Sequence, residues 1–150
     1  MDQFNQYAAL PYVVVDNKPL LLLATSRETR RWVLPKGWHK DGLEPHELAE
    51  LEALEEVGLK GTISSTPLGW YTYTKRLHFF SRVTCKVDIF ALKADHHLLD
   101  WAEKNQRDLA WVSPGDAANM VSERELTSLL ETITLLDTEL TVHPTETTGV

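Results

Sequence analysis

The chain has 150 residues, of which 43% are hydrophobic and 25% are charged, and its formal net charge is −7. These values are typical of one globular domain with its own core, and the acidic balance argues against general nucleic-acid binding. The single cysteine, Cys85, excludes an intramolecular disulfide and a cysteine-based zinc cluster. No apolar run has membrane-spanning length, and MDQFNQ lacks a secretion signal, so we expect a cytoplasmic protein without a membrane partner.

Two strands are predicted at the start of the chain. Residues 7–15 are rich in β-branched and aromatic side chains, which favour a strand, and Pro11 indicates a sheet edge or a bulge. Asp16-Asn17 is typical of a turn. Residues 19–25 form a short, continuous apolar run between turn signals, so we expect a buried strand there.

A polar connection follows and carries Arg27, Arg30 and Arg31, and a short strand over residues 32–34 separates it from Lys36. These cations form either a solvated loop or a phosphate clamp. The clamp is the functional interpretation, because arginine forks match phosphate oxygens in bidentate fashion. The four basic residues are therefore the candidates for binding substrate phosphates.

A helix is predicted over residues 45–57, because proline suits the first turn and Gly58 suits a left-handed stop. At about 3.6 residues per turn, Glu52, Glu55 and Glu56 fall within an arc of about 100° on one face. Such carboxylates repel one another, and a hard cation such as Mg²⁺ prefers oxygen ligands. This face is the candidate metal site, and a solvated helix face is the alternative.

The second half of the chain is predicted to contain strands and then helices. Asp95–Asn105 is polar and is expected to be a loop with a short helical turn. A short helix is predicted from Ser113 and a longer one from Ser122, with Glu125 completing a capping box. The candidate strands cover residues 60–68, 70–75, 78–93 and 109–112.

The pattern as a whole predicts an α/β protein with a mixed β-sheet packed between helices. No internal repeat and no interdomain linker interrupts it, so we expect a single domain over residues 1–140. Residues 141–150 are rich in threonine and lack a core pattern, which is typical of a frayed or disordered tail. The pattern leaves the oligomeric state open.

The stretch GWHKDGLEPHELAELEALEEVGL, residues 37–59, resembles a Nudix box, whose pattern is G-x5-E-x7-R-E-U-x-E-E-x-G-U with U aliphatic. Two positions depart from that pattern. Leu43 stands where the box has glutamate, with Glu44 one residue late, and Leu51 stands where it has arginine. The matching positions are Gly37, Glu52, Glu55, Glu56, Gly58 and Leu59.

The flanking segments RRWVLPKGW and DWAEKNQRDLAWVSPGDA are similar to the branch that contains diphosphoinositol polyphosphate and diadenosine polyphosphate hydrolases. The resemblance implies an α/β/α sandwich and Mg²⁺-dependent cleavage of a diphosphate linkage, with Mn²⁺ as an alternative ion. It also implies that the Gly37 carbonyl and the side chains of Glu52, Glu55 and Glu56 hold the metals, with Glu55 and Glu56 central to catalysis. The partner would be a small polyphosphate.

A catalytic base or extra ligand is expected from outside the box. Glu103 is the first candidate and Asp95 the second, and a plain surface position is an equal alternative for Glu103. Lys75-Arg76 is either a substrate-facing pair or a solvated hairpin tip.

The two departures from the box motivate a second function, a Nudix-fold protein that binds a phosphorylated ligand or a protein partner without efficient turnover. Leu51 cannot pair with Glu55 as an arginine would, so we expect it to lower activity. The competing interpretation is that Leu51 is buried against its neighbours.

Overall fold

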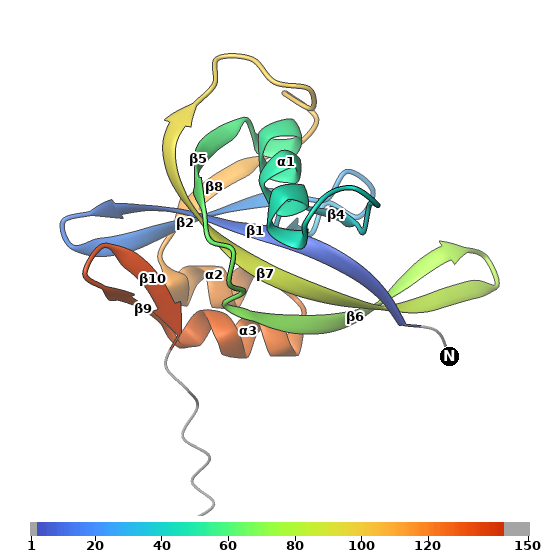
Figure 1. Ribbon diagram of the computed structural model, residues 1–150. Coiled ribbons are helices and arrows are strands. Elements are labelled where there is room, and N and C mark those ends of the chain that lie inside the picture. Colours follow the sequence, from blue (N-terminus) through green and yellow to red (C-terminus); the bar gives the residue numbers. More distant parts are fainter. Residues whose placement is uncertain (1–2, 143–150) are drawn as a thin grey trace, which may run out of the picture.

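The computed structural model describes residues 3–142 and shows one eight-stranded mixed sheet with helices on both faces (Figure 1). The strands of this sheet are β1 (Gln3–Val15), β2 (Lys18–Thr25), β3 (Trp32–Val33), β4 (Lys36–Trp38), β5 (Leu59–Ile63), β6 (Gly69–His78), β7 (Ser81–His97) and β8 (Leu109–Val112). The helices are α1 (Pro45–Val57), α2 (Pro114–Met120) and α3 (Arg124–Glu131), and a separate hairpin consists of β9 (Ile133–Leu136) and β10 (Glu139–Val142).

Strand β1 is the centre of the sheet. It runs parallel to β7 over residues 3–12, and on its other side it pairs antiparallel with β4 over 6–8 and with β2 over 12–15. The predicted buried strand over 19–25 is confirmed as β2, and the predicted turn before it has positive φ at both Asp16 and Asn17. The expected α/β class with a mixed sheet is confirmed.

Pro11 corrects one expectation, because it is neither at a sheet edge nor at a bulge. It is buried within β1 and lies in register with Leu92 of β7. The Ala9 N–H donates to the Pro35 carbonyl on the β4 side, and alternation along the strand directs the nitrogen of Pro11 to that same side. On that side, Pro11 lies between the part of β1 that pairs with β4 and the part that pairs with β2. Its missing N–H therefore costs the sheet no hydrogen bond.

The sheet has α1 on one face and α2 and α3 on the other (Figure 1), and a hydrophobic core lies on each face. One lies under α1, whose small residues Ala49 and Ala53 let it approach the sheet closely. The other lies under α2 and α3. The buried residues under α1 include Ala9, Leu22, Leu48, Val57, Phe90 and Leu92, and those on the other face include Leu10, Leu21, Tyr71, Ile89, Leu126 and Leu130. Within residues 3–142, no helix is long and apolar enough to cross a bilayer.

The predicted capping box at Ser122 is wrong, and the helix is shorter than expected. Helix α3 begins at Arg124 with Glu123 as its N-cap. Glu125 instead accepts hydrogen bonds from the backbone N–H and the hydroxyl of Thr72 in β6, at 2.8 and 2.7 Å. Glu125 thus pairs with the N–H of Thr72, a residue of another element, and not with the start of its own helix.

The C-terminal part differs from the predicted helix and tail. Ile133 has helical spacing in the sequence but begins β9, which pairs with β10. Residues 141 and 142 belong to β10, and the rest of the predicted tail, 143–150, lies outside the described residues. The predicted long strand is β7, which extends to His97 and so includes the start of the predicted loop at Asp95. The short helix predicted from Ser113 is confirmed as α2, with the Ser113 side chain as its cap.

Candidate active site

Helix α1 has the bounds that its sequence predicts. Pro45 stands in its first turn, and the N–H of Glu44 donates to the Glu47 carboxylate at 2.8 Å. Gly58 ends the helix with φ of 70°, and its N–H donates to the Leu54 carbonyl at 3.1 Å. The start and the end of the helix determine which way the three glutamates face. Glu56 faces β4.

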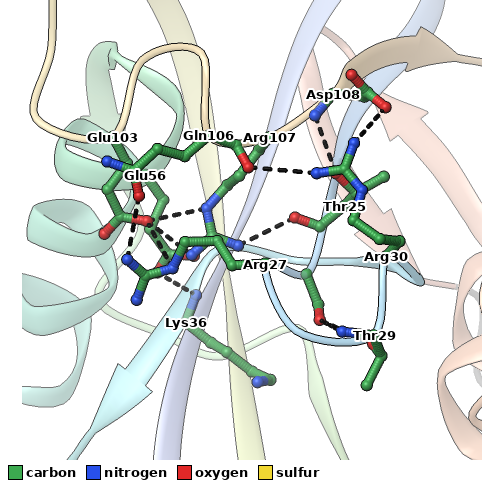
Figure 2. Close-up of polar contacts among 11 residues, drawn as sticks. Thr25, Arg27, Thr29, Arg30, Lys36, Glu56, Glu103, Gln106, Arg107 and Asp108 are labelled. Atoms are coloured by element: carbon green, nitrogen blue, oxygen red, sulfur yellow. Dashed lines mark hydrogen bonds and ion pairs between the residues drawn. The ribbon is translucent and has the colours of Figure 1, made fainter.

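Glu56 is a buried carboxylate at the centre of the site, only 5% exposed. Its Oε2 accepts the backbone N–H of Lys36 at 3.1 Å, and its Oε1 lies 3.2 Å from Nη2 of Arg107 (Figure 2). Burial, followed by a hydrogen bond with Glu52, raises the pKa of Glu56 to about 9, although the charge of Arg107 lowers it. In the absence of a bound cation, this carboxyl is therefore neutral at pH 7.

Arg107 and Glu103 come from the segment that follows β7 and face α1 (Figure 2). The Arg107 guanidinium donates from Nη2 and Nε to Oε1 of Glu103, at 2.7 and 3.0 Å, and from Nη1 to the Thr25 carbonyl at 3.1 Å. The Glu103 N–H donates to the Glu55 carbonyl at 3.0 Å. The structure therefore brings the predicted outside carboxylate, Glu103, to the predicted helix.

Glu52 approaches the backbone of β4 so closely that a side chain at Gly37 would have to displace its carboxylate. A Cβ placed on Gly37 would lie 2.4 Å from Oε1 of Glu52. This proximity supports the two predicted metal ligands as neighbours. Glu55 is partly exposed on the same helix.

The donors fit a hard cation in kind, since they are carboxylate oxygens crowded together. Burial, followed by the neighbouring Glu52, raises the pKa of Glu56 and outweighs the effect of Arg107. Within residues 3–142, however, no three His, Cys, Asp or Glu side chains converge in the arrangement of a metal site. Part of the reason is Arg107, which contacts both Glu56 and Glu103.

Two of the predicted phosphate-binding arginines are held by polar partners in the segment that follows β7. Arg27 donates to Gln106 at 3.1 Å and lies 3.6 Å from Glu103. Arg30 is held by Asp108, with Nη2 2.7 Å from Oδ2. The structure therefore places both arginines against the segment that carries Glu103. Arg27 also lines a hollow with Lys36, and Arg31 lines an adjoining hollow with Lys36.

Two adjoining hollows make up the candidate substrate groove. The first has a volume of about 160 Å³ and contains Glu56 and Arg107 among its lining residues; the second has a volume of about 300 Å³. Residues common to both include Ser26, Glu28, Val33, Lys36 and Lys75.

Lys36 is the cation that links the carboxylates to the groove. Burial, with a smaller effect of Lys75, lowers the pKa of the Lys36 ammonium, whose Nζ lies 5.0 Å from the Tyr73 ring centroid. Sequence reasoning left the role of Lys75 open and missed Arg107, although both stand in segments it had singled out. Only the position of Arg107 four residues after Glu103 offered a signal.

The two departures from the box have different surroundings. Leu43 packs against the core under α1. Leu51 is half-buried and lines a separate hollow beside Leu54 and Leu59. Leu51 faces this hollow together with Glu47, Glu50 and Lys60, so its effect on activity stays a prediction.

Comparisons with known proteins point to one family, although no family model matches the chain. Nudix hydrolase 12, mitochondrial, of Arabidopsis thaliana is 32% identical over 107 residues, which cover 69% of this chain and 53% of the relative. Nudix hydrolase 13, mitochondrial, of the same organism is 29% identical over 121 residues, covering 77% and 60%. The chain thus spans little more than half the length of these curated relatives.

Solved structures share the fold. The C. elegans Ap4A hydrolase in its binary complex has a TM-score of 0.63 at 20% identity, covering 85% of this chain and 93% of that one. A NUDIX hydrolase from Nitrosomonas europaea has a TM-score of 0.64 at 20% identity, covering 87% of each chain. The mixed sheet between helices is therefore the Nudix α/β/α sandwich. Together with the curated relatives and the glutamates spaced as in the box, this fold shows that the chain belongs to the Nudix superfamily.

Proposed function

We propose that this chain is a metal-dependent hydrolase that cleaves a diphosphate linkage in a nucleoside or inositol polyphosphate-type substrate. The observation that carries the proposal is the groove itself, in which the buried Glu56 faces the same hollow as Lys36, Lys75 and Arg107. A carboxylate cluster beside several cations suits a substrate that is both anionic and metal-bound.

The divalent ion, Mg²⁺ or Mn²⁺, would be held by the Gly37 carbonyl and by Glu52, Glu55 and Glu56. When bound, such an ion neutralises the charge of diphosphate oxygens and makes water a better nucleophile. Its positive charge is also what the Glu56 carboxyl needs in order to lose its proton at neutral pH, since burial otherwise favours the neutral form.

The side chains of the groove have separate tasks in this proposal. Lys36 and Lys75 bind the phosphates from one side, and Arg27 and Arg31 do so from the connection between β2 and β3. Glu103 acts as the base or as an additional ligand. Its contacts with Arg107 and Arg27 use Oε1, so a proton would be accepted at Oε2.

The alternative function, ligand binding without efficient turnover, has one observation in its favour. Leu43 and Leu51 replace two charged positions of the box; Leu43 packs against the core under α1, and Leu51 lines a hollow away from Glu56. The groove would still bind phosphates in that case, since its cations come from elsewhere in the chain.

Phosphate release and product identification on a substrate panel test the proposal. Structural neighbours supply two of the compounds, since one is an Ap4A hydrolase and another is the NUDIX domain of Shewanella oneidensis NrtR complexed with ADP ribose; a diphosphoinositol polyphosphate completes the panel. We expect cleavage of a diphosphate linkage with Mg²⁺ or Mn²⁺ and none with EDTA. Tight binding of a panel compound without any product would instead establish the binding function.

A further inference from the structure

Helix α1 presents its glutamates without any cation of its own. The segment Pro45–Val57 contains no lysine and no arginine. Position 51 faces the hollow lined by Leu54 and Leu59 and not the buried Glu56. At about 100° per residue, positions 51 and 56 lie about 140° apart around the helix. Any positive charge that faces Glu56 must therefore come from outside the helix.

Arg107 provides that charge, and its guanidinium is surrounded by acceptors. The side chain is only 9% exposed and contacts Oε1 of Glu56, Oε1 of Glu103 and the carbonyl of Thr25. Three different nitrogens take part in these contacts. A planar fork satisfies such a set, whereas a lysine ammonium has only three donors on a single atom.

The segment that carries Arg107 is attached to α1 independently of this side chain. The Leu98 N–H donates to the Gly58 carbonyl at 2.8 Å, and the Glu103 N–H donates to the Glu55 carbonyl at 3.0 Å. The Trp101 ring packs against Gly58, where a Cβ would lie 2.4 Å from ring atoms. Loss of the guanidinium is therefore expected to release two carboxylates without detaching the segment.

We propose that Arg107 is a positioning residue that holds Glu56 and Glu103 in one arrangement. This inference rests on the proposed hydrolase function. Both oxygens of Glu56 then have a fixed partner, the Lys36 N–H at Oε2 and Arg107 at Oε1. Glu103 is kept beside Glu56 because Nη2 of Arg107 contacts both.

Four variants test the role of the fork: Arg107→Lys, Arg107→Met, Arg107→Met with Leu51→Arg, and the control Arg124→Met, an exposed arginine at the start of α3. Partners that orient metal ligands contribute about 10- to 100-fold to affinity or activity. We expect losses of that size in kcat and in Mn²⁺ affinity for both single Arg107 variants, with little change in KM. The control should stay within about twofold, because its side chain lies outside the site.

Arg107→Lys keeps the charge but not the fork, so its melting temperature should fall less than that of Arg107→Met while kcat falls in both. A purely structural role would lower the melting temperature and kcat together. Adding Leu51→Arg should not restore Arg107→Met. Full kcat and Mn²⁺ affinity in Arg107→Lys, restoration by Leu51→Arg, or tighter Mn²⁺ binding in Arg107→Met would each overturn the inference.

A double-mutant cycle in metal-free protein separates this inference from the proposed function. The melting temperatures of Arg107→Met, Glu103→Gln and the double variant are compared with that of the unaltered chain. The double variant should lose less than the two single variants together, because both remove the same contact. Additive losses would contradict the positioning role even if the enzyme is active. Strong coupling between the two substitutions would support the positioning role even if no substrate on the panel is cleaved.

Discussion

The two flanks of helix α1 are built from the same short stretch of sequence and have opposite characters. On one flank, Glu52 and Glu56 face β4 and the segment that carries Arg107. On the other, Leu51 and Leu54 line a partly apolar hollow next to β5. The comparison shows that Leu51, which departs from the box, lies on the flank that faces β5, here called the packing flank. A substitution at this position should therefore act first on the surroundings of β5. The charge that the carboxylate flank needs comes from Arg107.

Removing the charge of Glu56 should have the largest effect. Glu56→Gln keeps the volume of the side chain but weakens metal binding, so we expect kcat to fall by at least about 100-fold, the size of the penalty for misplaced catalytic groups. Phosphate release measures the loss, and circular dichroism checks that the fold is intact. Full activity would remove Glu56 from the site.

Filling the space at Gly37 should have a smaller effect on the same flank. The new Cβ of Gly37→Ala would displace the Glu52 carboxylate, which lies 2.4 Å away. Because that carboxylate is the end of a flexible side chain, folding should change little, whereas Mn²⁺ affinity should fall by about 10-fold. The matched control is Gly115→Ala, where the added Cβ meets no atom within 4 Å. Unchanged Mn²⁺ affinity would show that Glu52 is not a ligand.

The stability of the metal-free protein should decrease as the pH rises. Burial and Glu52 raise the pKa of Glu56 from its ordinary 4.5 to about 9, and Glu52, Glu103, Arg107 and Lys36 are the charged groups that face it. The folded state thus holds a proton that the unfolded chain releases. Its contribution is complete below pH 4.5 and is lost as the pH passes through about 9.

Thermal melting in EDTA at pH 6 and pH 9.5 measures this decrease. Glu56→Gln has no proton to lose and should show a smaller decrease over the same interval. Equal decreases in the two proteins would assign the pH dependence to other groups.

An arginine at position 51 should have the smallest effect and should act on the packing flank. Leu51→Arg loses part of the contact with Leu54 and Leu59, which we expect to cost about 1 kcal/mol in the free energy of unfolding. Turnover should not rise, because the carboxylate flank already has Arg107. Urea denaturation and phosphate release measure the two quantities. A clear gain in kcat would restore the original expectation that Leu51 lowers activity.

The sequence alone determined helix α1. The spacing of glutamates, the proline at the first turn and Gly58 at the end are local signals, and the helix has the predicted bounds Pro45–Val57. The strand β2 and the helix α2 were likewise encoded in runs of a few residues. Periodicity and capping involve neighbours in the chain, so they can be recognised without a fold.

Only the tertiary structure decided which side chains meet in the groove. Arg107 reaches the carbonyl of Thr25, 82 residues away, and Glu125 leaves its predicted cap to bind Thr72, 53 residues away. Both contacts depend on how the sheet is ordered and on where the segment after β7 returns to α1. A buried donor or acceptor takes whichever partner the fold brings within hydrogen-bonding distance, because leaving it unpaired costs about 1–3 kcal/mol. Local sequence patterns do not contain that information.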